Sequence, residues 1–176
     1  IYGISYVGGV IGEARYYWNN DGVGIIEKVY STDNTINATG DNVGGCIGSS
    51  QLRMRNMKTI YTEKSNEPKI NGKNCVGGIT GKATYNNVSD NVSYYTIDGA
   101  KVENANILAT GGYVGGISGN QMGTVYAGAV LNTTVNTTGN FAGGIVGYYT
   151  ASDKKVASYV ASEKIYILHS FCSNSE

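Results

Sequence analysis

Short runs of alternating apolar and polar residues follow one another along the chain, and Gly, Asn and Asp separate them. The segment TIDGAKVENANILATG at 96–111 shows this pattern. Within it we expect Ile97, Val102 and Ile107 to point inward. The residues expected in turns or facing solvent are Asp98, Gly99, Asn104 and Asn106. Runs this short predict strands of about four to six residues rather than helices.

One apolar frame built around a Gly pair recurs five times. Its copies are YVGGVIG at 6–12, NVGGCIG at 42–48, CVGGITG at 75–81, YVGGISG at 113–119 and FAGGIVG at 141–147. Their spacing is unequal, since 36 residues separate Gly8 from Gly44 but 28 separate Gly115 from Gly143. A fixed core segment with intervals of varying length is typical of a solenoid with insertions on one face. The pattern therefore predicts a β-solenoid of about five coils with variable loops.

Further apolar positions recur at fixed distances before the Gly pair. One set lies eight residues before the first Gly and contains Ile36, Ile107 and Val135, with Ile70 displaced by one. A second set lies 18 residues before it and contains Ile26, Ile97 and Val125. The rhythm breaks in QLRMRNMKTIYTEK at 51–64, where the sequence allows either an inserted helical turn or a hairpin.

The two apolar flanks of each Gly pair lie three residues apart, so strict alternation would point them to opposite faces of a strand. We expect a bend that turns both inward, because both positions are apolar in every copy. The flanks are Val7, Val43, Val76, Val114 and Ala142 on one side and Val10, Cys46, Ile79, Ile117 and Ile145 on the other. Gly suits such a corner because it adopts positive φ easily and because, lacking Cβ, it lets the next coil approach closely.

The pairs expected at the corners are Gly8 and Gly9, Gly44 and Gly45, Gly77 and Gly78, Gly115 and Gly116, and Gly143 and Gly144. The alternative is a flexible Gly loop, but flexible loops would not keep apolar flanks in a fixed frame. We expect Gly116 and Gly144 to stack in adjacent coils, and we expect Asn120 in a loop.

Stacked coils at the strand spacing of about 4.8 Å give five coils a height of roughly 24 Å. Each coil buries its apolar positions only against its neighbours, so the end coils expose strand edges that can pair with other chains. The tail at 148–176 has strand-like residues but no sixth Gly pair. We expect it to form an incomplete last coil or an end cap.

Composition favours an all-β chain of one domain. The 176 residues include 26 Gly, 15 Tyr, 2 Phe and 1 Pro, and Gly and Tyr suit turns and strands better than helices. The formal net charge is zero, so no surface for nucleic acid is expected. No apolar run is long enough for a membrane-spanning helix, so membrane insertion is not expected. Because the chain begins close to a repeat, we expect a single domain over 1–176 that is a piece of a longer protein.

Three Cys residues are too few and too irregularly spaced for a disulfide framework. Cys46 and Cys75 occupy apolar positions of the repeat, so we expect both to be buried free thiols. Cys172 lies in the tail.

No catalytic set is recognisable in the sequence. His169 is the only histidine, so a hydroxyl or thiol nucleophile activated by histidine would have to combine it with Ser170 or Cys172, and closeness along a strand does not create that geometry. HExxH and the calcium-loop pattern do not occur. GGITGKA at 77–83 lacks the first Gly and the final hydroxyl of a phosphate loop. We expect no catalytic residue, cofactor or metal site.

Paired acids for glycoside hydrolysis are an open alternative, because a solenoid can align carboxylates that are distant in sequence. The acids in turn-like settings are Asp21, Asp33, Asp41 and Asp98. Asp in such settings commonly accepts hydrogen bonds from backbone amides. This favours a structural role for these carboxylates.

An aromatic cluster stands just before a polar turn, in YYWNND at 16–21. Tyr16, Tyr17 and Trp18 are therefore candidates for a surface that stacks on sugars or binds a protein. The structural alternative is that one ring covers an edge of the solenoid and another packs on a neighbouring coil.

The five V-G-G-[ILV]-x-G frames, each followed by a polar gap, a strand and Asn- or Thr-rich turns, resemble the GLUG motif of large secreted and cell-wall proteins of bacteria. The resemblance covers about residues 3–150 and is clearest in GGYVGGISGNQMGTVYAGAVLNTTVNTTGNFAGGIVG. GLUG repeats occur in the non-catalytic N-terminal regions of immunoglobulin A-cleaving metalloproteases and in adhesins. The resemblance implies a right-handed parallel β-helix on a bacterial surface or secreted protein, with any peptidase domain elsewhere in the parent chain.

Three functional hypotheses follow. The leading one is a non-enzymatic spacer or scaffold between neighbouring domains of the same chain, with adhesion as an added role. The alternative is a module that binds a glycan or a host protein such as an immunoglobulin, centred on Tyr16, Tyr17 and Trp18. The third is a carbohydrate-active β-helix enzyme.

Overall fold

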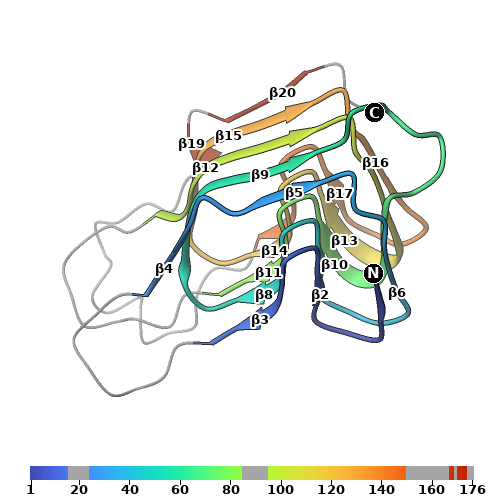
Figure 1. Cartoon of the computed structure of the whole chain (residues 1–176), viewed down its shortest axis with the longest axis horizontal. Coiled ribbons are helices and arrows are strands. Elements are labelled where there is room, and N and C mark those ends of the chain that lie inside the picture. The colour runs from blue at the N-terminus through green and yellow to red at the C-terminus, as the bar shows by residue number, and fades with distance from the viewer. Residues whose placement is uncertain (16–23, 85–94, 150–166, 169, 174–176) are drawn as a thin grey trace.

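The computed structural model describes residues 1–15, 24–84, 95–149, 167–168 and 170–173 (Figure 1). These residues form strands and no helix. The paired strands run parallel, as in the pairs of β10 with β13 and of β12 with β15. The prediction of an all-β chain is confirmed.

The strands form three parallel sheets, which we call A, B and C. Sheet A contains β1 (Tyr2–Gly3), β2 (Val7–Gly8), β6 (Ile36–Ala38), β7 (Val43–Gly44), β10 (Ile70–Gly77), β13 (Asn106–Gly115), β16 (Thr134–Thr137) and β17 (Ala142–Gly143). Sheet B contains β3 (Ile11–Ala14), β8 (Ile47–Ser50), β11 (Thr80–Ala83), β14 (Ser118–Gln121) and β18 (Val146–Tyr149). Sheet C contains β4 (Ile25–Glu27), β5 (Tyr30–Thr32), β9 (Arg53–Ile60), β12 (Tyr95–Glu103), β15 (Thr124–Leu131), β19 (Ile167–Leu168) and β20 (Phe171–Ser173).

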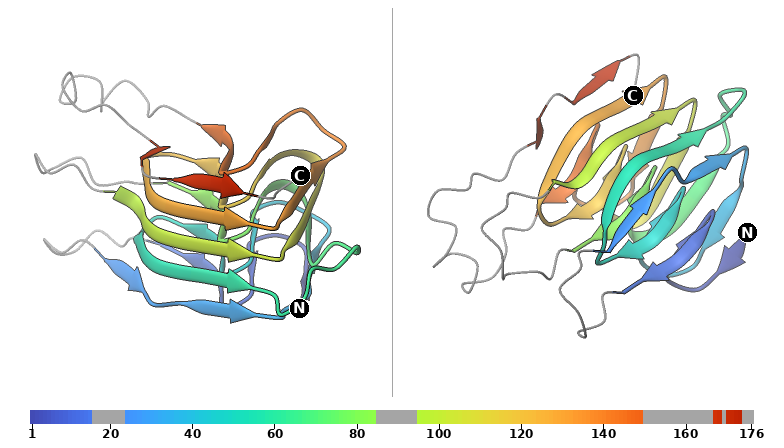
Figure 2. Two further views of the ribbon diagram at one scale, coloured as in Figure 1. Left: turned by 90° about the horizontal axis from the view of Figure 1, so that it is seen from above. Right: turned by 60° about the vertical axis from the view of Figure 1, so that its left-hand side comes forward.

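The chain passes through sheets A, B and C in that order and then returns to sheet A. We call one such passage a layer. Layer 1 comprises β1–β5, layer 2 β6–β9, layer 3 β10–β12, layer 4 β13–β15 and layer 5 β16–β20. Strands of successive layers lie side by side in chain order, from the blue strands of layer 1 to the orange and red strands of layer 5 (Figure 2). The described part of the tail supplies β19 and β20, which pair with β15.

The five Gly frames lie in register across sheet A. Val43 pairs with Val7 and Val76, and Val114 pairs with Val76 and Ala142. The first Gly residues of the frames pair in the same order, namely Gly8, Gly44, Gly77, Gly115 and Gly143. The frame seen in the sequence is therefore one structural column.

The apolar positions before the Gly pairs also form columns. One column in sheet A contains Ile36, Ile70, Ile107 and Val135. One column in sheet C contains Ile26, Met54, Ile97 and Val125. Ile70 is one residue closer to its Gly pair because β10 and β13 change register between Gly72 and Asn74.

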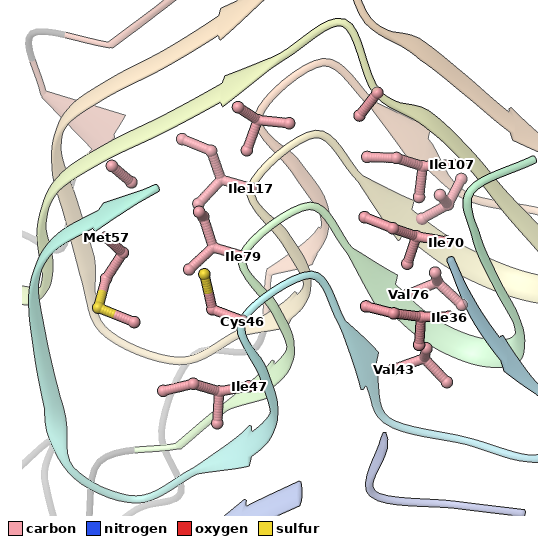
Figure 3. Packing of buried hydrophobic residues seen from close by; sticks show 14 of the residues in the cluster. Ile36, Val43, Cys46, Ile47, Met57, Ile70, Val76, Ile79, Ile107 and Ile117 are labelled. Carbon is pink, nitrogen blue, oxygen red and sulfur yellow. The ribbon is translucent and has the colours of Figure 1, made fainter. Parts of the chain in front are cut away.

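The core is a stack of these columns. Ile36, Ile70 and Ile107 lie one above another, and Cys46, Ile79 and Ile117 form a second row (Figure 3). All six side chains are fully buried, as are the expected inward residues Ile97 and Val102. Burial of one such Ile side chain contributes about 1.5–3 kcal/mol to stability.

Three local expectations differ from the structure. The segment 51–64 contains strand β9, not a helical turn or a hairpin. Asn120 lies in strand β14, not in a loop. Asn106 is buried at the start of β13, where its side-chain amide donates to the carbonyl oxygens of Ser65 and Asn66.

The Gly pairs form corners between sheets A and B, but not through positive φ as expected. The described positive-φ Gly residues are Gly99, Gly112 and Gly123, none of which belongs to a pair. Space requires Gly instead, because a Cβ on the first Gly of the pair, such as Gly115, would lie 2.1 Å from the carbonyl oxygen of Ser118. A Cβ on the second Gly, such as Gly78, would lie 2.1 Å from the carbonyl oxygen of Gly116 in the next layer. The predicted close approach of neighbouring layers is thus the reason for the second Gly, whereas the first Gly is required by the tight turn within its own layer.

Two of the apolar residues that flank the Gly pairs are exposed, although we expected all of these flanking residues in the core. Val10 in layer 1 and Ala142 in layer 5 face solvent, while Cys46, Ile79 and Ile117 in the inner layers are fully buried at the position of Val10. Within the described part of the chain the end layers have a neighbour on one side only, so the same position is buried inside the stack and exposed at its ends. Ile145 in layer 5 is partly buried against the core.

Candidate functional site

Tyr16, Tyr17, Trp18 and Asp21 lie outside the described residues. The residues that bracket them, Arg15 and Gly24, lie between β3 of sheet B and β4 of sheet C. The segments 85–94 and 150–166 also connect sheet B to sheet C. Three of the five connections at this corner are therefore longer than the direct connections in layers 2 and 4.

The tail residues considered for catalysis are not brought together in the described structure. His169 lies outside the described residues, while Cys172 is exposed in β20. The hydroxyl of Ser170 accepts a hydrogen bond of 3.0 Å from the backbone amide of Gly128. Among the described residues, no cluster of three or more His, Cys, Asp or Glu side chains could hold a metal ion.

Three of the four Asp residues that the sequence places in turn-like settings are described, and their carboxylates bond to other residues of the chain. The carboxylate of Asp33 accepts hydrogen bonds from the backbone amide and the hydroxyl of Thr62, which hold the pKa of Asp33 below its usual value. Asp41 accepts from the backbone amide of Asn74 at 3.2 Å and from its side-chain amide at 3.0 Å. Asp98 lies 3.4 Å from Arg55. This agrees with the structural role expected for Asp in turns.

Cys46 and Cys75 are buried free thiols, as predicted. Burial raises the pKa of Cys46 to about 11, and burial also raises the pKa of Cys75. The thiol of Cys46 lies 3.1 Å from the carbonyl oxygen of Lys58, to which it donates. Both thiols are therefore protonated at neutral pH, and protonated thiols are weak nucleophiles.

Three columns of left-handed residues run through the layers, and the sequence pattern did not reveal them as columns. One column lies in sheet A, directly before the first apolar residue of a frame, and contains Tyr6, Asn42, Cys75 and Tyr113. The column in the middle of sheet C contains Lys28, Asn56, Gly99 and Ala127. The column that follows sheet C contains Asp33, Asn104 and Asn132. Asn, Asp and Gly tolerate the left-handed conformation best. Their presence at these positions was the only indication of the columns in the sequence.

Asparagine side chains link the layers along the last of these columns. The side-chain amide of Asn132 donates to the side-chain oxygen of Asn104 at 2.8 Å, and the amide of Asn104 donates to the carbonyl oxygen of Tyr61 at 2.8 Å. The hydroxyl of Tyr61 donates to the carbonyl oxygen of Asn34 at 2.6 Å, and burial raises its pKa. This region is therefore a hydrogen-bonded seam between layers.

A polar hollow of about 390 Å³ opens beside this seam. It is lined by Asp33, Tyr61, Thr62, Glu63, Lys64, Ser65 and Lys69. Two of these polar groups, the Asp33 carboxylate and the Tyr61 hydroxyl, are already bonded within the chain. These two groups thus have a structural role, and the lining of the hollow carries both charge signs.

An aromatic cluster covers the corner of sheets A and B in layers 4 and 5. The rings of Tyr113 and Phe141 are stacked with centroids 5.2 Å apart, and the ring of Tyr148 lies 4.8 Å from that of Tyr113. Phe141 and Tyr148 remain exposed. The sequence signal is the aromatic first residue of the frames YVGGISG and FAGGIVG, whereas the sequence interpretation considered only Tyr16, Tyr17 and Trp18 as an aromatic site.

The large exposed apolar side chains of the described residues occur only in the two end layers. Those of layer 1 are Ile1, Tyr2, Ile4, Tyr6, Val10, Ile25 and Tyr30. Those of layer 5 are Phe141, Tyr148 and Phe171. Both ends of the stack are therefore more apolar on their surfaces than the layers between them.

No protein family, no curated protein and no solved structure matches this chain. The described residues contain no helix that could cross a membrane.

Proposed function

We propose that the chain is a non-enzymatic β-solenoid module, a right-handed parallel β-helix of five coils, that serves as a spacer or scaffold in a secreted or cell-surface protein of a bacterium. The observation that carries the proposal is the register of the Gly frames through all five layers. The resemblance to GLUG repeats supports the handedness, the location and the place among other domains of a longer chain.

Rigidity along the stack suits a spacer. The backbone amide of Gly45 donates to the carbonyl oxygen of Gly77 at 3.1 Å, and that of Gly116 donates to Gly143 at 3.1 Å. Bonds of this kind join every layer to the next, while fully buried Ile side chains fill the interior. In such a stack each repeat is held mainly by its neighbours, so length grows with repeat number at about 4.8 Å per layer.

A distance measurement tests the spacer role. Tyr2 and Asn136 belong to one column of sheet A, in layers 1 and 5. Spin labels on Tyr2→Cys and Asn136→Cys, in a Cys172→Ser background at low protein concentration, should give one narrow distance distribution. Its centre should lie near the four-step separation of about 19 Å, plus the label linkers. A broad distribution would contradict a rigid spacer.

Activity assays test the non-enzymatic part of the proposal. The purified chain should show no turnover with panels of peptide and glycoside substrates. Turnover that a point substitution in this chain abolishes would overturn this part.

The alternative is a binding module for a glycan or a host protein, and one observation favours it. The segment that contains Tyr16, Tyr17 and Trp18 joins sheet B to sheet C, as do the two other long connections. These three long connections belong to layers 1, 3 and 5, and binding residues occur disproportionately on the loops that a rigid scaffold carries. Retention of a glycan or an immunoglobulin on an array, lost in Trp18→Ala, would favour this function over a pure spacer.

A further inference from the structure

We propose that the polar hollow at the connection 61–69 binds a small molecule that carries a carboxylate and hydroxyl groups, as an acidic sugar does. The proposal goes beyond the spacer function and does not depend on it. It starts from the path of the chain at 61–69, where β9 of sheet C leads into β10 of sheet A.

The connection at 61–69 is longer than the fold requires. The same turn from sheet C to sheet A takes three residues at 33–35 and two residues each at 104–105 and 132–133. Layer 2 uses nine residues at this place, and they project from the side of the stack (Figure 2). Closing the turn therefore does not explain the extra residues.

Side chains on both sides hold the projecting connection in place. The carboxylate of Asp33 accepts hydrogen bonds from the backbone amide of Thr62, at 2.7 Å, and from its hydroxyl. On the other side, the buried side-chain amide of Asn106 donates to the carbonyl oxygens of Ser65 and Asn66 at 3.1 and 2.9 Å. The hollow is thus preformed, as sites for small molecules usually are.

The hollow has the size and the lining of a site for one small polar molecule. Its volume of about 390 Å³ lies in the lower part of the range of about 300–1,000 Å³ that small-molecule sites occupy. All seven lining residues carry a charged or hydroxyl side chain. An apolar ligand would remove these groups from water without pairing them, which is unfavourable.

Two charged groups of the lining are available to a ligand. Within the described residues, no hydrogen bond or ion pair engages the carboxylate of Glu63 or the ammonium group of Lys64. Lys69 lies close to Asp33, because its charge, after the hydrogen bonds from Thr62, contributes to the lowered pKa of that carboxylate. The hollow therefore offers two ammonium groups and one free carboxylate.

These groups define the class of ligand. A ligand carboxylate can accept charge-assisted hydrogen bonds from Lys64 and Lys69, while the carboxylate of Glu63 can accept a hydrogen bond from a ligand hydroxyl. A simple anion would leave Glu63 unmatched, and a cation would face two ammonium groups. A single sugar ring with a carboxylate provides both kinds of group within one small molecule.

Titration of the chain with glucuronic acid, followed by NMR shifts of the backbone amides at 61–69, tests the proposal. We expect saturable binding, with glucose, which has no carboxylate, bound at least tenfold more weakly. Lys64→Gln and Lys69→Gln should each weaken binding of glucuronic acid about tenfold, because each removes a charge-assisted hydrogen bond. All variants should fold, since none of the substituted side chains is buried.

Lys73→Gln is the matched control. Lys73 is exposed in β10 and does not line the hollow, so its substitution should leave binding unchanged. Absence of saturable binding, equal binding of glucose, or an equal effect of all three Lys substitutions would overturn the proposal.

Glu63→Gln separates sugar recognition from simple attraction of an anion. Loss of its negative charge would strengthen the attraction of any anion, whereas loss of a charged acceptor for a hydroxyl should weaken binding of glucuronic acid. We expect weaker binding, and we expect acetate to bind at least tenfold more weakly than glucuronic acid to the wild-type chain. Stronger binding to Glu63→Gln, or equal binding of acetate, would show an adventitious ion only and overturn the proposal.

Discussion

Gly116 and Gly144 stack in adjacent layers so closely that a Cβ on Gly116 would lie 2.1 Å from the carbonyl oxygen of Gly144. The same Cβ would lie 2.8 Å from a methyl carbon of Val130 across the core. Backbone thus packs on backbone at this corner, and no side-chain movement relieves the clash. This contact between layers is the reason why the second residue of the Gly pair has no side chain.

Gly116→Ala should therefore be strongly destabilising. We expect a loss of about 2–4 kcal/mol, from overpacking and forced backbone strain. Gly144→Ala is the matched control, because its Cβ would meet the thiol of Cys172 at 2.9 Å in the end layer, and that side chain can move. It should cost less than about 1 kcal/mol. Urea unfolding measures both, and equal midpoints would contradict the proposed role of layer contact.

Ala127→Gly should stabilise the protein. Ala127 has a φ of 52° in the left-handed column of sheet C, a conformation that costs a residue with a Cβ about 1–2 kcal/mol relative to Gly. Gly99 occupies the same column with a φ of 74°. We expect a net gain of about 0.5–1 kcal/mol, since Gly also makes the unfolded chain more flexible.

The control for this prediction is Ala129→Gly, two residues along the same strand and outside the left-handed group. It should lose about 0.5–1 kcal/mol, as expected for Gly in a strand interior. Thermal or urea unfolding should thus give shifts of opposite sign for the two variants. Shifts of the same sign would show that Ala127 is not strained.

Asn104 should contribute to stability in two separable ways. It holds a φ of 55° and bonds to both Tyr61 and Asn132. Asn104→Ala loses both contributions and should cost about 2–3 kcal/mol. Asn104→Gly restores the backbone preference but not the hydrogen bonds, so it should cost about 1 kcal/mol. If Asn104→Gly were as damaging as Asn104→Ala, the backbone contribution would be refuted.

Alkaline pH should weaken the fold through Cys46. Its pKa is raised from 9.0 to about 11 by burial, so the folded state keeps a proton that the unfolded state loses between these values. Stability from the protonated thiol is therefore complete below about pH 9 and declines as pH rises towards 11, by up to about 3 kcal/mol. Urea midpoints at pH 8 and pH 10.5 should fall less in Cys46→Ala than in the wild-type chain. An identical fall in both would exclude this thiol as a cause.

The sequence by itself determined the all-β character of the chain, the repeat and its alignment. Val43, Val76 and Val114 could be placed in one column because each layer must bury the same apolar positions against the next. The displacement of Ile70 by one residue was visible as well, and the structure adds only the register shift that causes it. A pattern repeated along the chain carries this information because each copy meets the same neighbours.

Strand β9 escaped the sequence pattern for a physical reason. Met54 and Met57 are both fully buried although they lie three residues apart. Asn56 between them is left-handed, with a φ of 54°, and this turns the following residues by one position. A pattern of strict alternation cannot predict such a reversal. The sequence therefore indicated a break in the repeat where the structure has one continuous strand.

Burial at the frame positions was decided only by the tertiary structure. Val10 and Cys46 occupy the same position of the repeat, yet Val10 is 53% exposed and Cys46 is fully buried. The difference lies outside both frames, in whether a further layer is stacked on the residue. Local sequence specifies which side chains can join a core, but only the neighbouring layers decide which of them are removed from water.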